Sequence, residues 1–351
     1  MITAGIIGYG YWGPNLVRNI WANPEINLFA VCDKNVKRLA ELKRQYPSVD
    51  TITDCGQIIK SPDIQAVMIA TPVPTHYEMA KKSLLAGKHT FIEKPMARST
   101  AECEELIELA EEKKLTLMTG HTFIYSPVVR KIREIIDSGI LGDIQYISSR
   151  RLNLGIVQND INVAWDLAPH DLSIILYLLK DKPVSVNCQG MAHLKEGIED
   201  VTNMTLEFPN SGFATIHSSW LDPNKVREMT IVGTRKMLVY DDIQPIEKIK
   251  IYDKRVENPP YYKTFGEFQF SYHYGDIHSP YIKQSEPLEL ECQHFIDCIN
   301  TGVKPESSGY EGLEVVRILE AASESLHKGG ACVALSDEAA TVEPILFHMS
   351  G

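Results

Sequence analysis

Short apolar runs alternate with segments of helical spacing over the first 120 residues. The apolar runs have the length of buried strands and occur at Ile2–Ile7, Leu28–Cys32, Ala66–Ala70, His89–Ile92 and Leu115–Thr119. The segments between them predict helices at Asn15–Trp21, near Gln57–Ile59, from His76 through Leu85 and at Ala101–Lys114. This alternation predicts an α/β fold with a parallel, doubly wound sheet.

The pattern changes after about residue 125. Period-two alternation predicts strands at Asp143–Leu152, Val184–His193, Val201–Phe208, Gly212–Trp220, Val226–Val232 and Lys236–Tyr240. Helices are predicted at Pro127–Ser138, Pro169–Leu179, Leu288–Asn300 and Tyr310–His327, with an aromatic loop over residues 242–287. The second half is therefore predicted to be a mostly antiparallel sheet with few helices, and the chain to end in a short strand or tail.

A glycine-rich turn joins the first predicted strand to the first helix. Gly8, Gly10 and Gly13 follow the G-x-G-x-x-G pattern, with Tyr11 and Trp12 inside it. These glycines allow a tight turn, close approach to a pyrophosphate and close packing of helix on strand. The helix N-terminus then offers free N–H groups to phosphates. A glycine-rich turn without a ligand is the alternative.

Asp33 ends the second strand, 20 residues after Gly13. A carboxylate at this place accepts hydrogen bonds from the adenosine ribose of a dinucleotide. Because it repels the 2′-phosphate of NADP, NAD is the predicted cofactor. Lys34 and Lys37 leave NADP open as the less favoured choice, since basic residues beside the strand end can hold a phosphate.

Other polar residues also follow predicted strands. Ligands of doubly wound sheets bind at the carboxyl ends of the strands, where Asp33, Thr71, Lys94 and His121 all fall. Lys94 belongs to the run Glu93-Lys94-Pro95, in which Pro95 is a candidate cis residue. A lysine here can stabilise negative charge on a substrate oxygen. A surface lysine at a turn explains the tripeptide equally well.

A second constellation is the run Trp165-Asp166-Leu167-Ala168-Pro169-His170-Asp171. Pro169 suits the first turn of a helix, which would leave Asp166 in the entry loop and His170 in that first turn. A histidine at such a place can serve as a general base near neutral pH. The alternative is a capping aspartate beside a structural histidine.

Basic and aromatic residues provide candidates for substrate binding. Arg150-Arg151 with Asn153 could hold a carboxylate or a diphosphate, or could form a solvated basic edge. Tyr125 and the run 272–278 could line a substrate cleft, or pack in a core.

Composition narrows the classes of function. The net charge of −11 disfavours nucleic acid and anionic membranes as partners. The chain has no apolar run of membrane-spanning length and no predicted signal peptide, so we expect a cytoplasmic protein. The seven cysteines lack metal-binding spacing, so no metal site is expected. Lipase-like G-x-S-x-G, P-loop and H-E-x-x-H motifs are missing from the sequence.

These motifs together resemble the Gfo/Idh/MocA oxidoreductase family. The resemblance rests on the glycine pattern, Ala70-Thr71-Pro72 with His76, Glu93-Lys94-Pro95, Asp166 with His170, and the late runs Glu286-Pro287-Leu288 and 294–297. It implies an NAD-binding Rossmann domain at residues 1–122 and a substrate-binding and oligomerisation domain at residues 123–351. The latter would be an α/β domain with a large, open, mostly antiparallel sheet, and the C-terminal helix is a candidate to pack back on the Rossmann domain.

The resemblance also implies roles for single residues. Lys94 and His170 match the family's catalytic lysine and histidine, and Asp166 the acidic residue before that histidine. Cofactor contacts are implied for Gly8, Gly10, Tyr11, Trp12, Gly13, Asp33, Thr71, Pro72, His76, Glu93 and Lys94. Together with the candidates named above, we expect substrate contacts from Lys94, Tyr125, Arg151, Asn153, Trp165, Asp166 and His170.

The run 10–15 with the run 165–171 is most similar to nucleotide-sugar 3-dehydrogenases. This similarity implies oxidation of the 3-hydroxyl of UDP-N-acetylglucosamine or its uronic acid by NAD, in a homodimer or homotetramer. Two alternatives are an inositol or free-sugar dehydrogenase of the same family and, ranked lower because Lys94 and His170 are present, a non-catalytic NAD-binding regulator.

Overall fold

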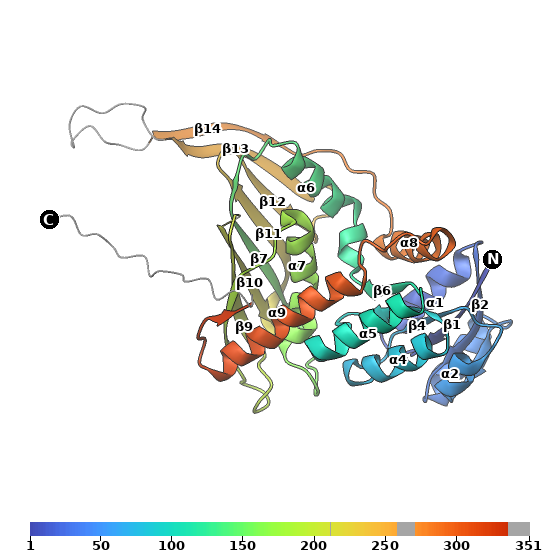
Figure 1. The fold of residues 1–351 in the computed structure, drawn as a ribbon. Helices are drawn as coiled ribbons and strands as arrows, with labels where there is room; N and C mark the ends of the chain where they lie inside the picture. Colours follow the sequence, from blue (N-terminus) through green and yellow to red (C-terminus); the bar gives the residue numbers. More distant parts are fainter. Residues whose placement is uncertain (211, 258–270, 336–351) are drawn as a thin grey trace.

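Two β-sheets with their helices form the molecule (Figure 1). The structure is a computed structural model that describes residues 1–210, 212–257 and 271–335. Residues 258–270 of the predicted aromatic loop and residues 336–351 of the expected tail lie outside the described residues.

The first sheet is parallel, six-stranded and doubly wound, as predicted, with strand order β3-β2-β1-β4-β5-β6. Its strands are β1 (Ile2–Ile7), β2 (Ile26–Cys32), β3 (Asp50–Ile52), β4 (Ala66–Ile69), β5 (His89–Glu93) and β6 (Leu117–Gly120). Its helices are α1 (Gly13–Ala22), α2 (Val36–Gln45), α3 (Cys55–Lys60), α4 (His76–Leu85) and α5 (Thr100–Glu112). The sequence analysis missed α2 and β3. All strands end at one edge, so the residues that follow them gather there.

The second sheet has nine strands and is antiparallel except where β10 pairs with β7. Its strands are β7 (Ile144–Leu154), β8 (Ser185–Met191), β9 (Val201–Phe208), β10 (Gly212–Ser219), β11 (Leu221–Gly233), β12 (Met237–Asp241), β13 (Ile249–Glu257), β14 (Ser271–His278) and β15 (Val333–Ala334). The predicted loop over residues 242–287 was wrong, because β13 and β14 extend the sheet there.

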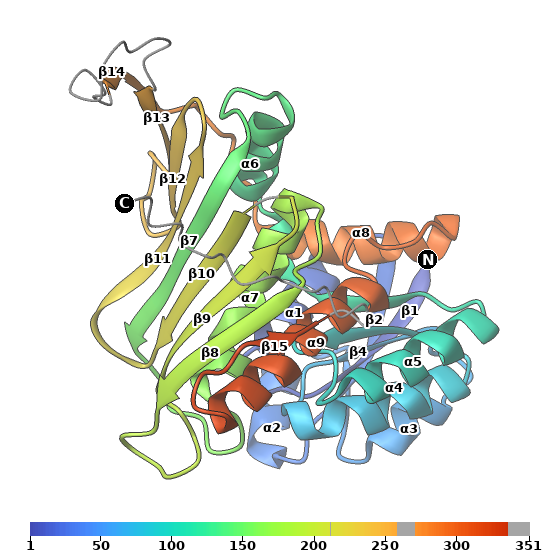
Figure 2. The same ribbon diagram turned by 60° about the vertical axis from the view of Figure 1, so that its left-hand side comes forward.

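One face of the second sheet is covered by helices and the other is open (Figure 2). The helices after the first sheet are α6 (Pro127–Asp137), α7 (Val163–Leu179), α8 (Pro287–Thr301) and α9 (Gly309–His327). Along β7, Ile147, Ser149 and Arg151 are buried on the covered face, whereas Tyr146 and Arg150 are exposed on the other. The covered face is thus the one that residues of α7 can meet.

Helices α8 and α9 join the two sheets. On α8, Cys292, Phe295 and Ile296 belong to the apolar core between the first sheet and α1. On α9, Leu313 and Val316 pack in the core on the other side of that sheet, while Val315 and Ile318 face the core of the second sheet. The two sheets therefore share apolar cores, which holds the edge of the first against the covered face of the second.

Candidate active site

The glycine-rich turn lies at the carboxyl edge of the first sheet. Gly8 has φ +104°, and a Cβ there would lie 2.3 Å from the Ala70 carbonyl oxygen. A Cβ on Gly13 would lie 2.4 Å from the Gly8 carbonyl oxygen. Only glycine allows these approaches, and the N-terminus of α1 opens at this turn with Trp12 before its first residue. The turn therefore has the shape and the free N–H groups that a dinucleotide pyrophosphate requires.

Asp33 lies beside this turn. Its carboxylate accepts hydrogen bonds from the backbone N–H groups of Tyr9 and Asn35, each at 2.7 Å. Arg38 Nη1 lies 3.9 Å from the same carboxylate. Arg38 is thus a cation beside the expected ribose position, and it was missed because α2, which carries it, was not predicted.

His76 ties two loops of the edge together. Its ring nitrogens lie 2.8 Å from the Pro95 carbonyl oxygen and 2.7 Å from the Thr71 carbonyl oxygen. The side chain is buried, which lowers its pKa. This corrects the expectation of a direct cofactor contact: with both ring nitrogens facing protein backbone, His76 positions the loops that carry Thr71 and the cis Lys94–Pro95 peptide.

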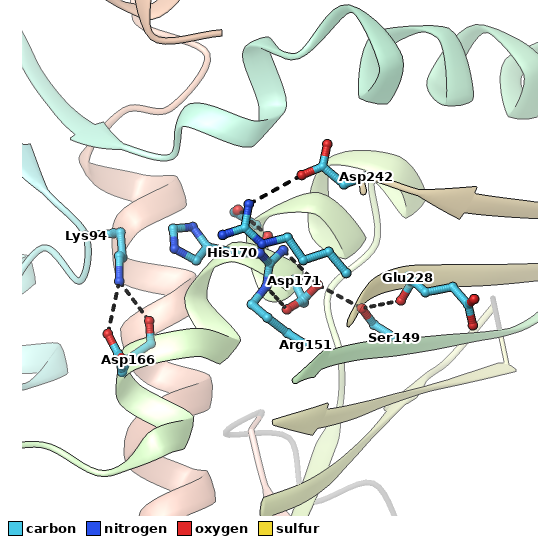
Figure 3. A network of polar contacts seen from close by, with 10 residues as sticks. Lys94, Ser149, Arg151, Asp166, His170, Asp171, Glu228 and Asp242 are labelled. Carbon is cyan, nitrogen blue, oxygen red and sulfur yellow. Dashed lines mark hydrogen bonds and ion pairs between the residues drawn. The ribbon is translucent and has the colours of Figure 1, made fainter. Parts of the chain in front are cut away.

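Lys94 reaches from the first sheet to α7 (Figure 3). Its Nζ donates to the Asp166 backbone oxygen at 2.7 Å and lies 3.7 Å from the Asp166 carboxylate. Burial lowers the pKa of Lys94, and the neighbouring Asp166 opposes that effect. The other Asp166 carboxylate oxygen accepts the indole N–H of Trp220 at 3.0 Å. Asp166 is therefore held from two sides and in turn positions Lys94.

The helix that carries Asp166 and His170 begins earlier than predicted. Its N-cap is Asn162, whose side chain accepts the N–H of Trp165 at 3.1 Å. Pro169 lies inside α7, not in its first turn, so the expected entry-loop position of Asp166 was wrong. Asp166 stands in the first turn and His170 one turn later, which places both on the same side of the helix.

His170 is a neutral imidazole among cations. Burial lowers its pKa well below 6.5, and the positive charges of Lys94, Arg151 and Arg227 lower it further. Its ring meets Phe123 edge-on at 5.1 Å and has no hydrogen-bond partner among the described residues. In the view of Figure 3 the ring lies between Lys94 and Arg151. A neutral ring with a free nitrogen can accept a proton from a substrate hydroxyl.

Arg151 does not offer its charge to solvent. Its Nε and Nη2 donate to Asp171 at 2.7 and 3.2 Å, and both side chains are buried (Figure 3). Ser149 adds a hydrogen bond to Asp171 at 2.8 Å. This corrects the expectation that Arg151 binds a diphosphate, because its guanidinium is paired inside the protein. Arg227, on the neighbouring strand β11 and more exposed, is the cation on this face that sequence reasoning missed.

We expect Asp171→Asn to lower the free energy of unfolding by about 3–5 kcal/mol, because it leaves the buried Arg151 charge without its counter-charge. Urea denaturation at pH 7 measures the loss. Glu324→Gln, which breaks the exposed pair with Lys328, is the control and should cost less than about 1 kcal/mol. Equal losses in the two variants would contradict a buried ion pair.

Two expected substrate residues have structural roles. The Trp165 indole N–H donates to Ser323 on α9 at 2.8 Å. Tyr125 is 1% exposed and its hydroxyl meets Ser307 at 2.8 Å. The expectation for Tyr125 is corrected, because its side chain is buried between elements, whereas Trp165 is only partly buried and stays a candidate for substrate contact. Asn153 stays a candidate: it lies on β7 on the same face as Arg151 and is half-buried.

Several buried polar atoms at the edge have no partner among the described residues: Trp12 Nε1, Glu93 Oε1, both ring nitrogens of His121 and Glu291 Oε1. Burial raises the pKa of Glu93 to about 7 and lowers that of His121 to about 3. Buried polar groups normally have hydrogen-bond partners, so unpaired groups at this edge are consistent with a site where a bound polar ligand supplies the missing partners. Sequence reasoning noted the strand-end position of His121, whereas nothing in the sequence signalled Glu291.

The described residues hold no group of three or more His, Cys, Asp or Glu placed to bind a metal ion. None of the helices in the described ranges combines the length and apolarity needed to cross a membrane.

Comparisons with known proteins agree with this architecture. Residues 2–121 match the model for the NAD-binding Rossmann fold of the Gfo/Idh/MocA oxidoreductase family, and residues 129–239 match the model for the GFO/IDH/MocA C-terminal domain.

Three relatives are informative. The UDP-N-acetylglucosamine 3-dehydrogenase of Acidithiobacillus ferrooxidans is 32% identical over 66% of this chain and 71% of its own length. A solved structure of that enzyme aligns over 93% of this chain and 98% of its own, with TM-score 0.77 and 24% identity. The myo-inositol 2-dehydrogenase of Thermotoga maritima is 23% identical over 92% of this chain and 96% of its own. A levoglucosan dehydrogenase in complex with NADH aligns over 95% of this chain and 99% of its own, with TM-score 0.80 and 20% identity.

Proposed function

The chain belongs to the Gfo/Idh/MocA oxidoreductase family and is an NAD(P)-dependent dehydrogenase, and within that family we propose that it oxidises the 3-hydroxyl of UDP-N-acetylglucosamine or its uronic acid. The product is a 3-keto nucleotide sugar. Support comes from the Acidithiobacillus ferrooxidans relative and from the site, where the neutral imidazole of His170 lies beside the cation Lys94 at the carboxyl edge of the Rossmann sheet.

Each residue has a defined task in this proposal. His170 accepts the proton of the substrate hydroxyl. Its lowered pKa keeps the ring unprotonated at neutral pH, so that it can act as the base. Lys94 donates a hydrogen bond to the same oxygen and stabilises its negative charge, while Asp166 positions Lys94. When bound, NAD supplies the hydride acceptor. Loss of the hydroxyl proton to His170 and of a hydride from the carbon leaves the ketone.

The cofactor half of the site fits NAD. The turn at Gly8–Gly13 would hold the pyrophosphate and Asp33 the adenosine ribose, with Tyr11, Trp12, Thr71, Pro72 and Glu93 around the edge. We propose residues 1–122 as the cofactor domain and residues 123–351 as the substrate and oligomerisation domain of a cytoplasmic enzyme.

We propose a homodimer or homotetramer that uses the open face of the second sheet. Tyr146 on β7 and Phe213 on β10 stack there at 5.6 Å and are 36% and 44% exposed. Light scattering coupled to size-exclusion chromatography tests this, and a monomer at micromolar concentration would refute it.

A panel of UDP-sugars, inositols and free sugars tests the substrate class, with NADH absorbance as the readout. We expect turnover with UDP-N-acetylglucosamine or its uronic acid, and calorimetric binding of the same compound. Turnover of a cyclitol without binding of any UDP-sugar would instead select the inositol dehydrogenase, which the Thermotoga maritima relative favours. Binding of NAD without turnover of any compound would select a regulator.

We expect Asp33→Asn to raise the kcat/KM ratio of NADP to NAD by roughly 10- to 100-fold, the range of a hydrogen bond to a charged group. The side-chain oxygen of asparagine can still accept the hydrogen bond from the Tyr9 backbone N–H, so the glycine-rich turn stays attached to this residue. The negative charge that repels a 2′-phosphate is lost. Steady-state kinetics with both cofactors measures the ratio. Arg38→Gln is the matched variant and should shift the ratio the opposite way, since it removes a cation from the same place. An unchanged ratio in Asp33→Asn would show that the adenosine ribose lies elsewhere.

A further inference from the structure

Two arginines lie opposite each other on the covered face of the second sheet. In the antiparallel register of β7 and β11, Arg227 pairs with Arg151, and the next pair on the same face, Met229 with Ser149, is buried. Like charges directly opposite one another destabilise an antiparallel pair of strands. Folding therefore gives no reason for a second arginine at this place, and residues that conflict with folding in this way are expected at functional sites.

Asp171 neutralises Arg151, whereas Arg227 has no comparable partner. Arg227 Nη1 lies 3.5 Å from the Asp242 carboxylate, and its side chain makes no hydrogen bond to the described residues. Asp242 also accepts a hydrogen bond from Lys248 Nζ at 3.0 Å, so one carboxylate faces two cations. The Arg227 side chain is 38% exposed. Its N–H groups are therefore available to an anion that arrives from solvent.

This exposed cation lies beside the reacting centre. The Arg151 guanidinium lies 4.8 Å from the centre of the Phe123 ring, and the same ring meets His170 edge-on at 5.1 Å. Arg227 lies directly across from Arg151 on the adjacent strand. Its charge adds to the effects of burial and of the charges of Lys94 and Arg151 that lower the pKa of His170. One substrate molecule can therefore reach both the imidazole and Arg227.

The direction from Lys94 to Arg227 matches the layout of the proposed substrate. In the view of Figure 3, Lys94 and Asp242 lie on opposite sides of His170, and Arg227 lies beside Asp242. In UDP-N-acetylglucosamine one sugar ring carries both the reacting 3-hydroxyl and the diphosphate on C1. A ring whose hydroxyl lies at Lys94 and His170 can thus point its diphosphate toward Arg227.

We propose that Arg227 binds an oxyanion of the substrate and so sets the preference of the site for charged sugars. The inference deepens the proposed function and rests on it. A guanidinium can donate two parallel N–H groups to a phosphate or to a carboxylate. The proposed substrates offer a diphosphate and, in the uronic acid, a carboxylate as well.

Steady-state kinetics of Arg227→Gln with the proposed UDP-sugars tests this role. We expect KM for the sugar to rise roughly 10- to 100-fold, the range of a hydrogen bond to a charged group, while kcat and the KM for NAD stay nearly unchanged. The assay is run at about pH 8, where His170 is neutral with or without the charge of Arg227. Arg227→Lys should raise KM less, since it keeps the charge and loses only the paired N–H groups.

Arg235→Gln is the matched control. Arg235 is exposed in the turn at the other end of the β11–β12 hairpin, and its substitution should leave KM unchanged. The melting temperature of Arg227→Gln should not fall, because the substitution removes a like charge opposite Arg151 and leaves Asp242 paired with Lys248. A loss of stability or a failure to fold would assign Arg227 a structural role and overturn the inference.

Two substrates distinguish the source of the oxyanion. UDP-N-acetylglucosamine carries the diphosphate alone, whereas its uronic acid carries a carboxylate too. A higher KM for UDP-N-acetylglucosamine in Arg227→Gln assigns the diphosphate to Arg227, and a higher KM for the uronic acid alone assigns the carboxylate. Unchanged KM values for both overturn the inference while the proposed function stands. If wild type oxidises a cyclitol and no UDP-sugar, the proposed function itself is wrong.

Discussion

Lys94→Met should bind NAD yet turn over its sugar substrate more slowly than wild type by roughly 10²- to 10³-fold, the cost of removing one preorganised donor from a developing oxyanion. The Lys94 Nζ, held by the Asp166 carbonyl at 2.7 Å, is the fixed cation beside His170. Methionine keeps the length and the apolar stem of the side chain but supplies neither charge nor donor. The readouts are kcat from NADH absorbance and NAD affinity from calorimetry.

Lys82→Met is the control for this substitution. Lys82 is an exposed lysine on α4 that pairs with Glu78 at the surface, and its loss should change kcat less than twofold. The melting temperature of each variant separates a chemical effect from unfolding. A Lys94→Met enzyme that retains wild-type kcat would remove Lys94 from the chemistry and leave it as a link between β5 and α7.

The carboxyl edge of the first sheet could be predicted because its geometry follows from short segments. Each strand is a continuous apolar run, so the polar residue that ends it is visible in the sequence. Parallel strands end at one edge, which gathers Gly8, Asp33, Thr71 and Lys94 without knowledge of any distant contact. The same reasoning placed His121 at that edge.

Contacts between distant segments could not be predicted in this way. Pro169 looked like a helix start, yet α7 continues through it, because Val163 and Ala164 bury their side chains and Asn162 caps the helix. These interactions offset the backbone hydrogen bond that a proline cannot donate. The start of a helix thus depended on tertiary packing rather than on local preference.

The same limit applied to single side chains. The sequence presents Arg151 as a free cation, and only the pairing of β7 with α7 buries it against Asp171. Likewise, Glu291 lies on an ordinary amphipathic helix, and Thr122, which donates a hydrogen bond to its buried carboxyl, is 169 residues earlier in the chain. Charge and burial at these positions are properties of the assembled fold, so periodicity alone carries no sign of them.

His170→Asn should lower kcat by roughly 10²- to 10⁴-fold, the usual contribution of a general base, and should change the pH profile as well. In the folded protein the pKa of His170 lies well below 6.5, because burial and the charges of Lys94, Arg151 and Arg227 disfavour the imidazolium. The base is therefore neutral and active at pH 7. In wild type we expect kcat/KM to hold as pH falls to 6.5 and to decrease only in more acidic solution, as the ring gains its proton.

In His170→Asn the residual activity should no longer decrease in acidic solution, since asparagine does not titrate. We call this decrease of kcat/KM at low pH the acid limb of the profile. His327→Asn, at the exposed end of α9, is the control and should keep both the rate and the limb. An acid limb that persists unchanged in His170→Asn would assign the base to another group, and Glu93 would then be the first to test because burial raises its pKa to about 7. A purely structural role for His170 would lower the melting temperature and kcat together and leave the shape of the profile unchanged. The pH dependence, not the loss of rate, therefore identifies His170 as the proton acceptor.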